Sequence, residues 1–167
     1  MRWEKRPVEV ANLLNPAFCA VLLQHTVQSY CTEDPQGMDY LLAFLVLPLI
    51  LHPARRKSIP QQTRVSLIAW AEKQRDVNYN LVEHVLEMVP FTKEALIFAV
   101  QQGVIRFGDS EHNAANLLLG ASSPRTTNLW LEHSTADECR KKAKTVGDWF
   151  AEIGDSSIVY RVLDIHL

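Results

Sequence analysis

The sequence predicts a mainly α fold, a single helical domain with a winged helix-turn-helix-like core and a small β-hairpin. Of the 167 residues only 6 are glycine, while 47% are hydrophobic and 22% charged, which is typical of a helical globular domain. Apolar residues recur at helical spacing in several segments. A chain of this length buries about 70% of its surface on folding. We therefore expect an N-terminal extension at 1–14 and one domain at 15–167.

Residues typical of helix starts predict where the helices of the first half of the chain begin. Asn15 is suited to cap a helix that Pro16 opens, since proline at the first helical position loses no hydrogen bond. Apolar residues surround most of the circumference of this helix, which predicts that it is central in the fold. It is expected to end near Tyr30. A turn is expected next, at 34–37. Asp39 is then expected to cap a helix through the apolar run 40–51, which His52-Pro53 ends. A basic connector at 54–60 and a helix near 63–75 are expected to follow.

The segment 81–119 has the order of elements found in a winged helix-turn-helix. Pro90 is expected to end a first helix, Thr92 to cap a second, and Gly103 to end that second helix. The elements predicted are a helix at 81–89, a helix at 93–102, a strand at 104–107 and a returning strand at 117–119.

The clearest amphipathic pattern lies near the C-terminus. Ser134 or Thr135 is expected to cap a long helix whose apolar positions are spaced by 4, 3, 4 and 3, namely Cys139, Ala143, Val146, Phe150 and Ile153. Gly147 inside this helix costs about 1 kcal/mol relative to alanine, so another backbone is expected to pack closely there. A short helix at 156–162 follows.

The sequence contains no residue pattern that indicates catalysis. It has no GxxxxGK[ST] or GxGxxG loop for phosphate, and its 6 histidines are too dispersed for a metal motif. The 3 cysteines lack CxxC spacing, which favours buried, reduced thiols in a cytoplasmic protein. The longest apolar run, 40–51, is too short to cross a bilayer. We expect no cofactor, no metal, no enzymatic activity and no membrane contact.

Candidate contact residues fall into two groups. The first is a basic cluster in the predicted connector, Arg55, Arg56 and Lys57, joined by Arg64 downstream; there it would meet an acidic partner or a phosphate backbone. The second is apolar. Phe98 lies beside Ile97, off the inward stripe of its predicted helix, and Trp130 lies in an apolar triplet, so both are candidates for a protein-binding surface, with core packing as the alternative.

Three segments resemble a known family. They are Asn15-Pro16-Ala17 opening an apolar helix, the run Phe44-Leu45-Val46-Leu47-Pro48-Leu49-Ile50-Leu51-His52, and Val146-Gly147-Asp148-Trp149-Phe150-Ala151. Together they are similar to the middle components of bacterial three-component ABC (ABC-3C) systems, which include Lamassu-type anti-phage defence. The likeness extends from about Asn15 to the C-terminus, and its motifs are structural.

The resemblance implies a non-catalytic adaptor or regulatory subunit. Its partners would be an SMC/Rad50-like ABC ATPase that senses DNA and an effector subunit, often a nuclease, with DNA contacted only indirectly or within the assembled complex. The family offers no catalytic motif, so no residue inherits a catalytic role. The alternative is a winged-helix DNA-binding transcriptional regulator that uses residues 78–119 and the Arg55 cluster. A third alternative is an enzyme with an unfamiliar site.

Overall fold

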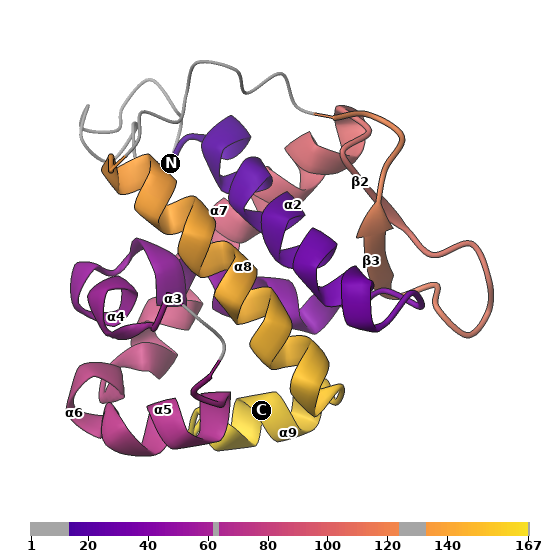
Figure 1. Ribbon diagram of the computed structural model, residues 1–167. Coiled ribbons are helices and arrows are strands. Elements are labelled where there is room, and N and C mark those ends of the chain that lie inside the picture. Colours follow the sequence, from indigo (N-terminus) through magenta and orange to yellow (C-terminus); the bar gives the residue numbers. More distant parts are fainter. Residues whose placement is uncertain (1–13, 62–63, 124–132, 167) are drawn as a thin grey trace.

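Two long helices, α2 (Pro16–Glu33) and α8 (Thr135–Ile153), lie side by side at the centre of the fold (Figure 1). The computed structural model describes residues 14–61, 64–123 and 133–166. The remaining helices are η2 (Tyr40–Leu42), α3 (Ala43–Leu51), α4 (Pro53–Ser58), α5 (Leu67–Lys73), α6 (Arg75–Asn78), α7 (Leu81–Gln101) and α9 (Ser156–Val162). The predicted mainly α class is confirmed.

The start of α2 follows the predicted cap. The Asn15 side chain accepts a hydrogen bond from the Ala17 amide at 2.9 Å, and Pro16 occupies the first helical position. The helix continues past Tyr30 to Glu33, and the amide of Asp34 bonds to the Tyr30 carbonyl at 3.0 Å. Its apolar side chains are buried on most sides, because α7 and α8 both pack against it. α2 is thus the central helix that its composition predicted.

α2 and α8 approach closely at Gly147, as the sequence predicted. A Cβ atom added there would lie 2.4 Å from the Thr26 carbonyl oxygen and 2.8 Å from Ser29 Cβ. The Thr26 hydroxyl donates to the Ala143 carbonyl at 3.2 Å, across the same contact. Only glycine therefore allows this separation of the two helices.

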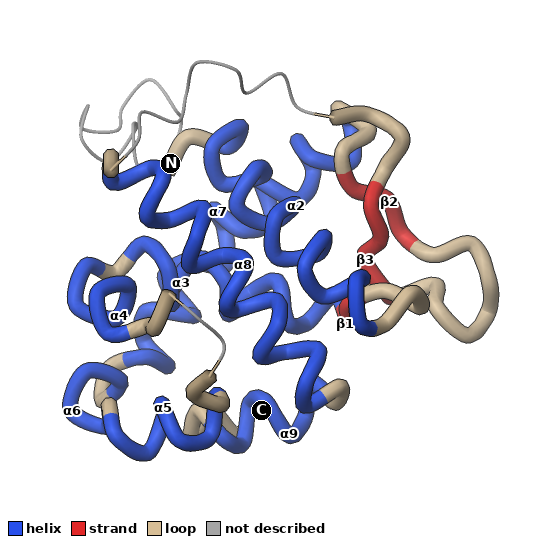
Figure 2. The backbone as a smooth tube through the Cα atoms, viewed as in Figure 1, coloured by secondary structure: helices blue, strands red, loops and turns tan. Residues whose placement is uncertain are grey.

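A small antiparallel sheet lies beside α2 (Figure 2). β1 (Met38–Asp39), β3 (Asn116–Leu119) and β2 (Ile105–Phe107) pair in that order, with Met38 opposite Leu117 and Ile105 opposite Leu119. The predicted hairpin is confirmed as β2 and β3. β1 was not predicted, because two residues are too few to show the alternation of a strand.

The predicted basic connector is a helix, α4. His52 Nδ1 accepts a hydrogen bond from the Arg55 backbone amide at 3.4 Å, and Pro53 is at the first helical position. His52 thereby caps α4 as Asn15 caps α2. The expectation of a connector at 54–60 was wrong. The residues that usually cap helices are serine, threonine, aspartate and asparagine, whereas here the cap is His52.

α5, α6 and α9 gather at one end of the molecule (Figure 1). The Ser66 hydroxyl caps α5 by accepting the Ala69 amide at 3.2 Å, so this helix begins later than the predicted 63. α9 spans the predicted residues, and Asp155 caps it by accepting the amides of Ser157 and Ile158. Ser134 likewise caps α8, accepting the Asp137 amide at 3.1 Å.

α7 is one continuous helix of 21 residues, although Pro90 was predicted to end it. Proline in a helix interior costs about 3 kcal/mol. Burial of residues on both sides of Pro90 offsets this cost, since Leu81 and Val85 lie in the same core as Ala95 and Ala99. Thr92, the predicted cap, is buried inside the helix. The predicted helix-turn-helix break is therefore wrong, and the winged-helix part of the fold prediction is not confirmed.

No helix among residues 14–61, 64–123 and 133–166 combines the length and apolar character that crossing a membrane requires.

Candidate partner-binding surface

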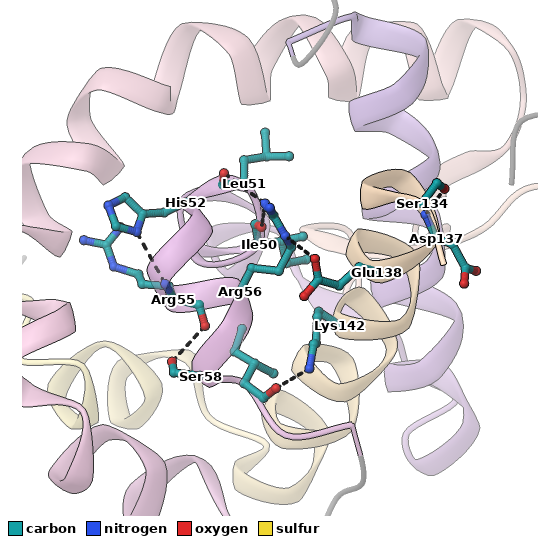
Figure 3. A network of polar contacts seen from close by, with 11 residues as sticks. Ile50, Leu51, His52, Arg55, Arg56, Ser58, Ser134, Asp137, Glu138 and Lys142 are labelled. Carbon is teal, nitrogen blue, oxygen red and sulfur yellow. Dashed lines mark hydrogen bonds and ion pairs between the residues drawn. The ribbon is translucent and has the colours of Figure 1, made fainter. Parts of the chain in front are cut away.

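The guanidinium of Arg55 lies inside the protein, at 0% exposure (Figure 3). Its Nη1 donates to the Pro48 carbonyl at 3.2 Å and lies 2.8 Å from His84 Nδ1, while its Nη2 donates to Asn80 Oδ1 at 2.5 Å. Because a guanidinium only donates hydrogen bonds, His84 Nδ1 is the acceptor in this contact. Burial lowers the pKa of Arg55. Arg55 thus joins α4 to α3 and to the start of α7.

Arg56 is also buried and fastens α4 to α8 (Figure 3). Its Nε donates to Glu138 Oε2 at 2.9 Å, and its Nη1 donates to the carbonyls of Ile50 and Leu51 at 3.2 and 3.3 Å. These carbonyls belong to the last turn of α3, so the cation lies at the negative end of that helix dipole. Nearby, Lys142 Nζ donates to the Ile59 carbonyl.

The predicted basic contact cluster therefore needs correction. Lys57 and Arg64 are exposed, but Arg55 and Arg56 are buried and hold helices together. A run of basic residues is usual on a solvated surface, and the groups with which Arg55 and Arg56 pair lie on other helices. Of the predicted apolar contacts, Phe98 is half-buried and packs against the core, and Trp130 lies outside the described residues.

A second basic run, at 140–144, is also partly committed to contacts within the chain. Arg140 Nη2 and Lys141 Nζ lie 2.7 and 2.8 Å from the two oxygens of Asp137 in the first turn of α8. Hydrogen bonds from Lys141 and Arg140 lower the pKa of Asp137 to about 2. Lys142 is buried, whereas Lys144 is exposed.

Two of the three thiols are buried, as the cysteine pattern predicted. Cys19 and Cys139 lie in the core, Cys31 is half-buried, and none forms a disulfide. Burial, followed by the neighbouring Cys139, raises the pKa of Cys19 to about 12. Cys19 is thus a protonated core residue at neutral pH.

The most distinctive surface feature is a row of exposed apolar residues on α7, which we call the α7 stripe. Its members are Val82, Leu86, Ile97 and Val100, exposed by 41%, 66%, 58% and 39%. At 3.6 residues per turn they fall within about 60° of the helix circumference. Exposed Lys93 lies within the same arc. The stripe therefore extends along nearly the whole length of α7.

An acidic edge borders the α7 stripe. Glu83 and Glu87 are exposed, one turn apart, roughly 60 and 100° further around the helix than Leu86. Neither forms a salt bridge within the described residues. Near the N-terminal end of α7, a groove of about 780 Å³ is lined in part by Ile68, Tyr79 and Val82. Charged side chains of Glu72, Arg75, Arg161 and Asp164 line the same groove, so the surface beside Val82 is mixed.

The sequence predicted only part of the exposed apolar surface of α7. Ile97, which the spacing placed beside Phe98 off the inward stripe, is exposed, but Val82, Leu86 and Val100 were not among the predicted contact residues. One signal was present, since the apolar residues between 81 and 89 span an arc of about 160°, wider than the stripe of about 100° that suffices for a core-facing helix.

Within the described residues, no group of three or more histidine, cysteine, aspartate or glutamate side chains is arranged to hold a metal ion. The described fold and surface define a small helical protein whose longest helix presents apolar side chains to solvent. Comparison with protein families specifies it further. The model of the family "ABC-three component (ABC-3C) system Middle Component 3" matches residues 3–167, so the chain belongs to this family.

This match extends the resemblance noted from the sequence motifs, since it includes most of the segment before Asn15. The chain is thus an accessory component of a three-component ABC system, which has other subunits. No curated protein and no solved structure matches it.

Proposed function

We propose that this chain is a non-catalytic adaptor that links an SMC/Rad50-like ABC ATPase to an effector subunit, in a cytoplasmic anti-phage complex of the Lamassu type. In this proposal the ATPase senses DNA, the effector is a nuclease, and the chain holds or restrains the effector until DNA is sensed. The chain itself meets DNA only through the assembled complex.

The observation that supports an adaptor most strongly is the α7 stripe on a member of a middle-component family. Large exposed apolar patches are uncommon on monomers and are typical of protein interfaces. The inner side of α7 already lies in the core, so the stripe is additional to what the fold requires. A subunit of a multi-component system would bury such a surface against another subunit.

A non-catalytic role is supported by where the ionisable side chains lie. Arg55, Arg56 and Lys142 donate to backbone carbonyls or to side chains of neighbouring helices. Asp137 is held by Arg140 and Lys141 of its own helix. These groups stabilise helix ends and helix contacts, which is a structural use of charge.

The alternative of a DNA-binding regulator has less support. It depended on phosphate contacts from the Arg55 cluster and on a separate recognition helix after Pro90. Two of those arginines are buried, and α7 is continuous through Pro90. Lys57, Arg64, Lys93 and Arg106 remain as exposed cations in the segments that this alternative uses. Arg106 lies 3.9 Å from Asp109, and phosphate-driven binding requires several cations that act together.

Co-expression with the ATPase and effector subunits of the same system tests the adaptor proposal. With an affinity tag on this chain, we expect both subunits to be recovered in a complex of fixed stoichiometry. Recovery of the chain alone as a monomer would refute the proposal. The purified chain is expected to show no ATP hydrolysis, no nuclease activity and no binding to duplex DNA at about 50 mM salt; turnover or tight DNA binding would refute the corresponding part.

A further inference from the structure

The α7 stripe has the spacing of a helix-pairing seam. On the exposed side, Val82 and Leu86 are 4 residues apart and Ile97 and Val100 are 3 apart. Exposed Lys93 lies on the same line between the two pairs, whereas Val89 is half-buried and packs against the core. Alternation of 3 and 4 keeps side chains on one line of a helix and is the pattern by which two helices interdigitate. From Val82 to Val100 the stripe is about 27 Å long at 1.5 Å per residue.

We propose that the α7 stripe binds an amphipathic helix from another subunit of the three-component system, with basic residues along one edge of that helix. This inference rests on the proposed adaptor function and specifies its contact surface. The apolar seam of the partner helix packs on Leu86 and Ile97, and about five of its turns cover the stripe from Val82 to Val100.

Charge around the stripe defines the chemistry of this partner. Glu83 and Glu87 are exposed on the same edge and have no salt-bridge partner within the described residues. Lysine or arginine residues spaced by one turn on the partner helix would lie opposite them. Steering of that kind raises association rates and excludes acidic partners.

Lys93 supplies the register. It is exposed in the middle of the stripe, between Leu86 and Ile97, and forms no salt bridge within the described part of the chain. One charged residue in an otherwise apolar seam lowers stability but fixes alignment and partner number. An acidic residue of the partner helix, placed against Lys93, would satisfy it and fix which turn meets which.

A helix fits this surface better than a strand. An added strand needs the free edge of a sheet, and the sheet of this chain has edge strands of only two and three residues, β1 and β2. α7 instead offers exposed apolar side chains in a row, and a groove lined by both apolar and charged residues, Ile68 and Tyr79 among them, lies at one end. A partner helix that overhangs α7 would insert a side chain into this groove.

Leu86→Asp and Ile97→Asp test the surface in the complex purified with the ATPase and effector subunits. Each is expected to weaken retention of the subunit that supplies the helix by more than tenfold, because a buried unpaired carboxylate is unfavourable. Ile158→Asp on α9 is the matched control, since Ile158 is 42% exposed and lies outside the stripe. It should leave the complex intact. Thermal unfolding of each free variant shows that it is folded.

The charged edge is tested separately with the double variant Glu83→Lys/Glu87→Lys. We expect retention to fall about tenfold at low salt and less at high salt, because the lost attraction is screened. Replacing the facing lysines or arginines of the partner helix by glutamate should restore binding. Unchanged retention of the double variant would refute the predicted basic edge.

The occupant is identified by a photo-crosslinker, p-benzoylphenylalanine in place of Leu86. The expected crosslink joins α7 to an amphipathic helical segment of the ATPase or effector subunit. A crosslink to a second copy of this chain, to its own residues, to DNA or to a non-helical segment would overturn the inference. If the complex forms normally with both aspartate variants, the inference is refuted while the adaptor function stands. If the parent chain recovers no subunit, the adaptor function itself fails.

Discussion

α7 and α8 are the two longest helices, at 21 and 19 residues, and they use their apolar residues differently. The inward row of α8, from Cys139 to Phe150, is buried, and the opposite side is charged. α7 has apolar residues on its inner side and again on its exposed side. The difference shows that a helix can have more apolar residues than its own domain buries, and that the surplus marks a surface for a partner.

The largest expected effect separates the two helices directly. Phe150→Ala on α8 should lower the free energy of unfolding by about 4 kcal/mol, because a fully buried aromatic ring leaves a cavity. Ile97→Ala on the α7 stripe should change it by about 0.5 kcal/mol, as expected for a surface position. Urea unfolding of the isolated chain measures both. Equal losses would show that the stripe belongs to the core.

A second variant examines how the inner side of α7 is attached. Arg55→Ala should lower the free energy of unfolding by about 3 kcal/mol, since Asn80, His84 and the Pro48 carbonyl lose a shared donor inside the protein. Lys57→Ala, in the same helix but exposed, is the control and should be nearly neutral. Loss of partner binding by Arg55→Ala without loss of stability would contradict the structural role of this arginine.

The third prediction concerns the contact of α8 with α2. In an open helix Gly147→Ala would stabilise by about 1 kcal/mol, but here the new methyl group overlaps the Thr26 carbonyl. Overpacking costs about 1 to 3 kcal/mol, which exceeds this gain, so we expect a net loss of about 1 kcal/mol, measured as a lower midpoint in urea. Lys144→Ala, exposed one turn earlier, should show no loss. A stabilised Gly147→Ala would show that the helices are further apart.

The smallest expected effect is the acid sensitivity of the start of α8. The pKa of Asp137 is about 2 in the folded chain, below its usual 3.8, because Lys141 and Arg140 donate to the carboxylate. The unfolded chain therefore takes up this proton first as pH falls. The contribution is present above about pH 4 and is lost towards pH 2. Asp137→Asn should flatten the pH dependence of unfolding in this range, while Lys144→Ala should not. An unchanged slope for Asp137→Asn would contradict the low pKa.

Local signals predicted much of the fold. Caps at Asn15 and Ser134 are hydrogen bonds within three residues of sequence, so the sequence contains both partners. The same holds for the hairpin and for the spacing of apolar residues in α8. The strand β1 pairs with Leu117 and Asn116, nearly eighty residues away. Because its partner is so distant in sequence, no local pattern predicted this strand.

The errors have a common physical origin in tertiary contacts. Pro90 was expected to end a helix on intrinsic cost alone, but burial of Leu81, Val85 and Ala95 in the core keeps the helix intact. Arg55 and Arg56 were expected at the surface because charge usually lies there; their burial depends on carbonyls and side chains that other helices bring to them. The exposed side of α7 was only partly foreseen, since the number of apolar residues that a core accepts is a property of the whole domain.

The central position of β3 in the sheet has a consequence for how the chain is made. β1 lies before α3, but the strand with which it pairs, β3, follows α7 in the chain and is synthesised much later. During translation at about 5 to 20 residues per second, the link between α2 and η2 must wait several seconds for its pairing strand. Slowing the ribosome between residues 40 and 119 would lengthen the time in which this short strand remains open to other chains.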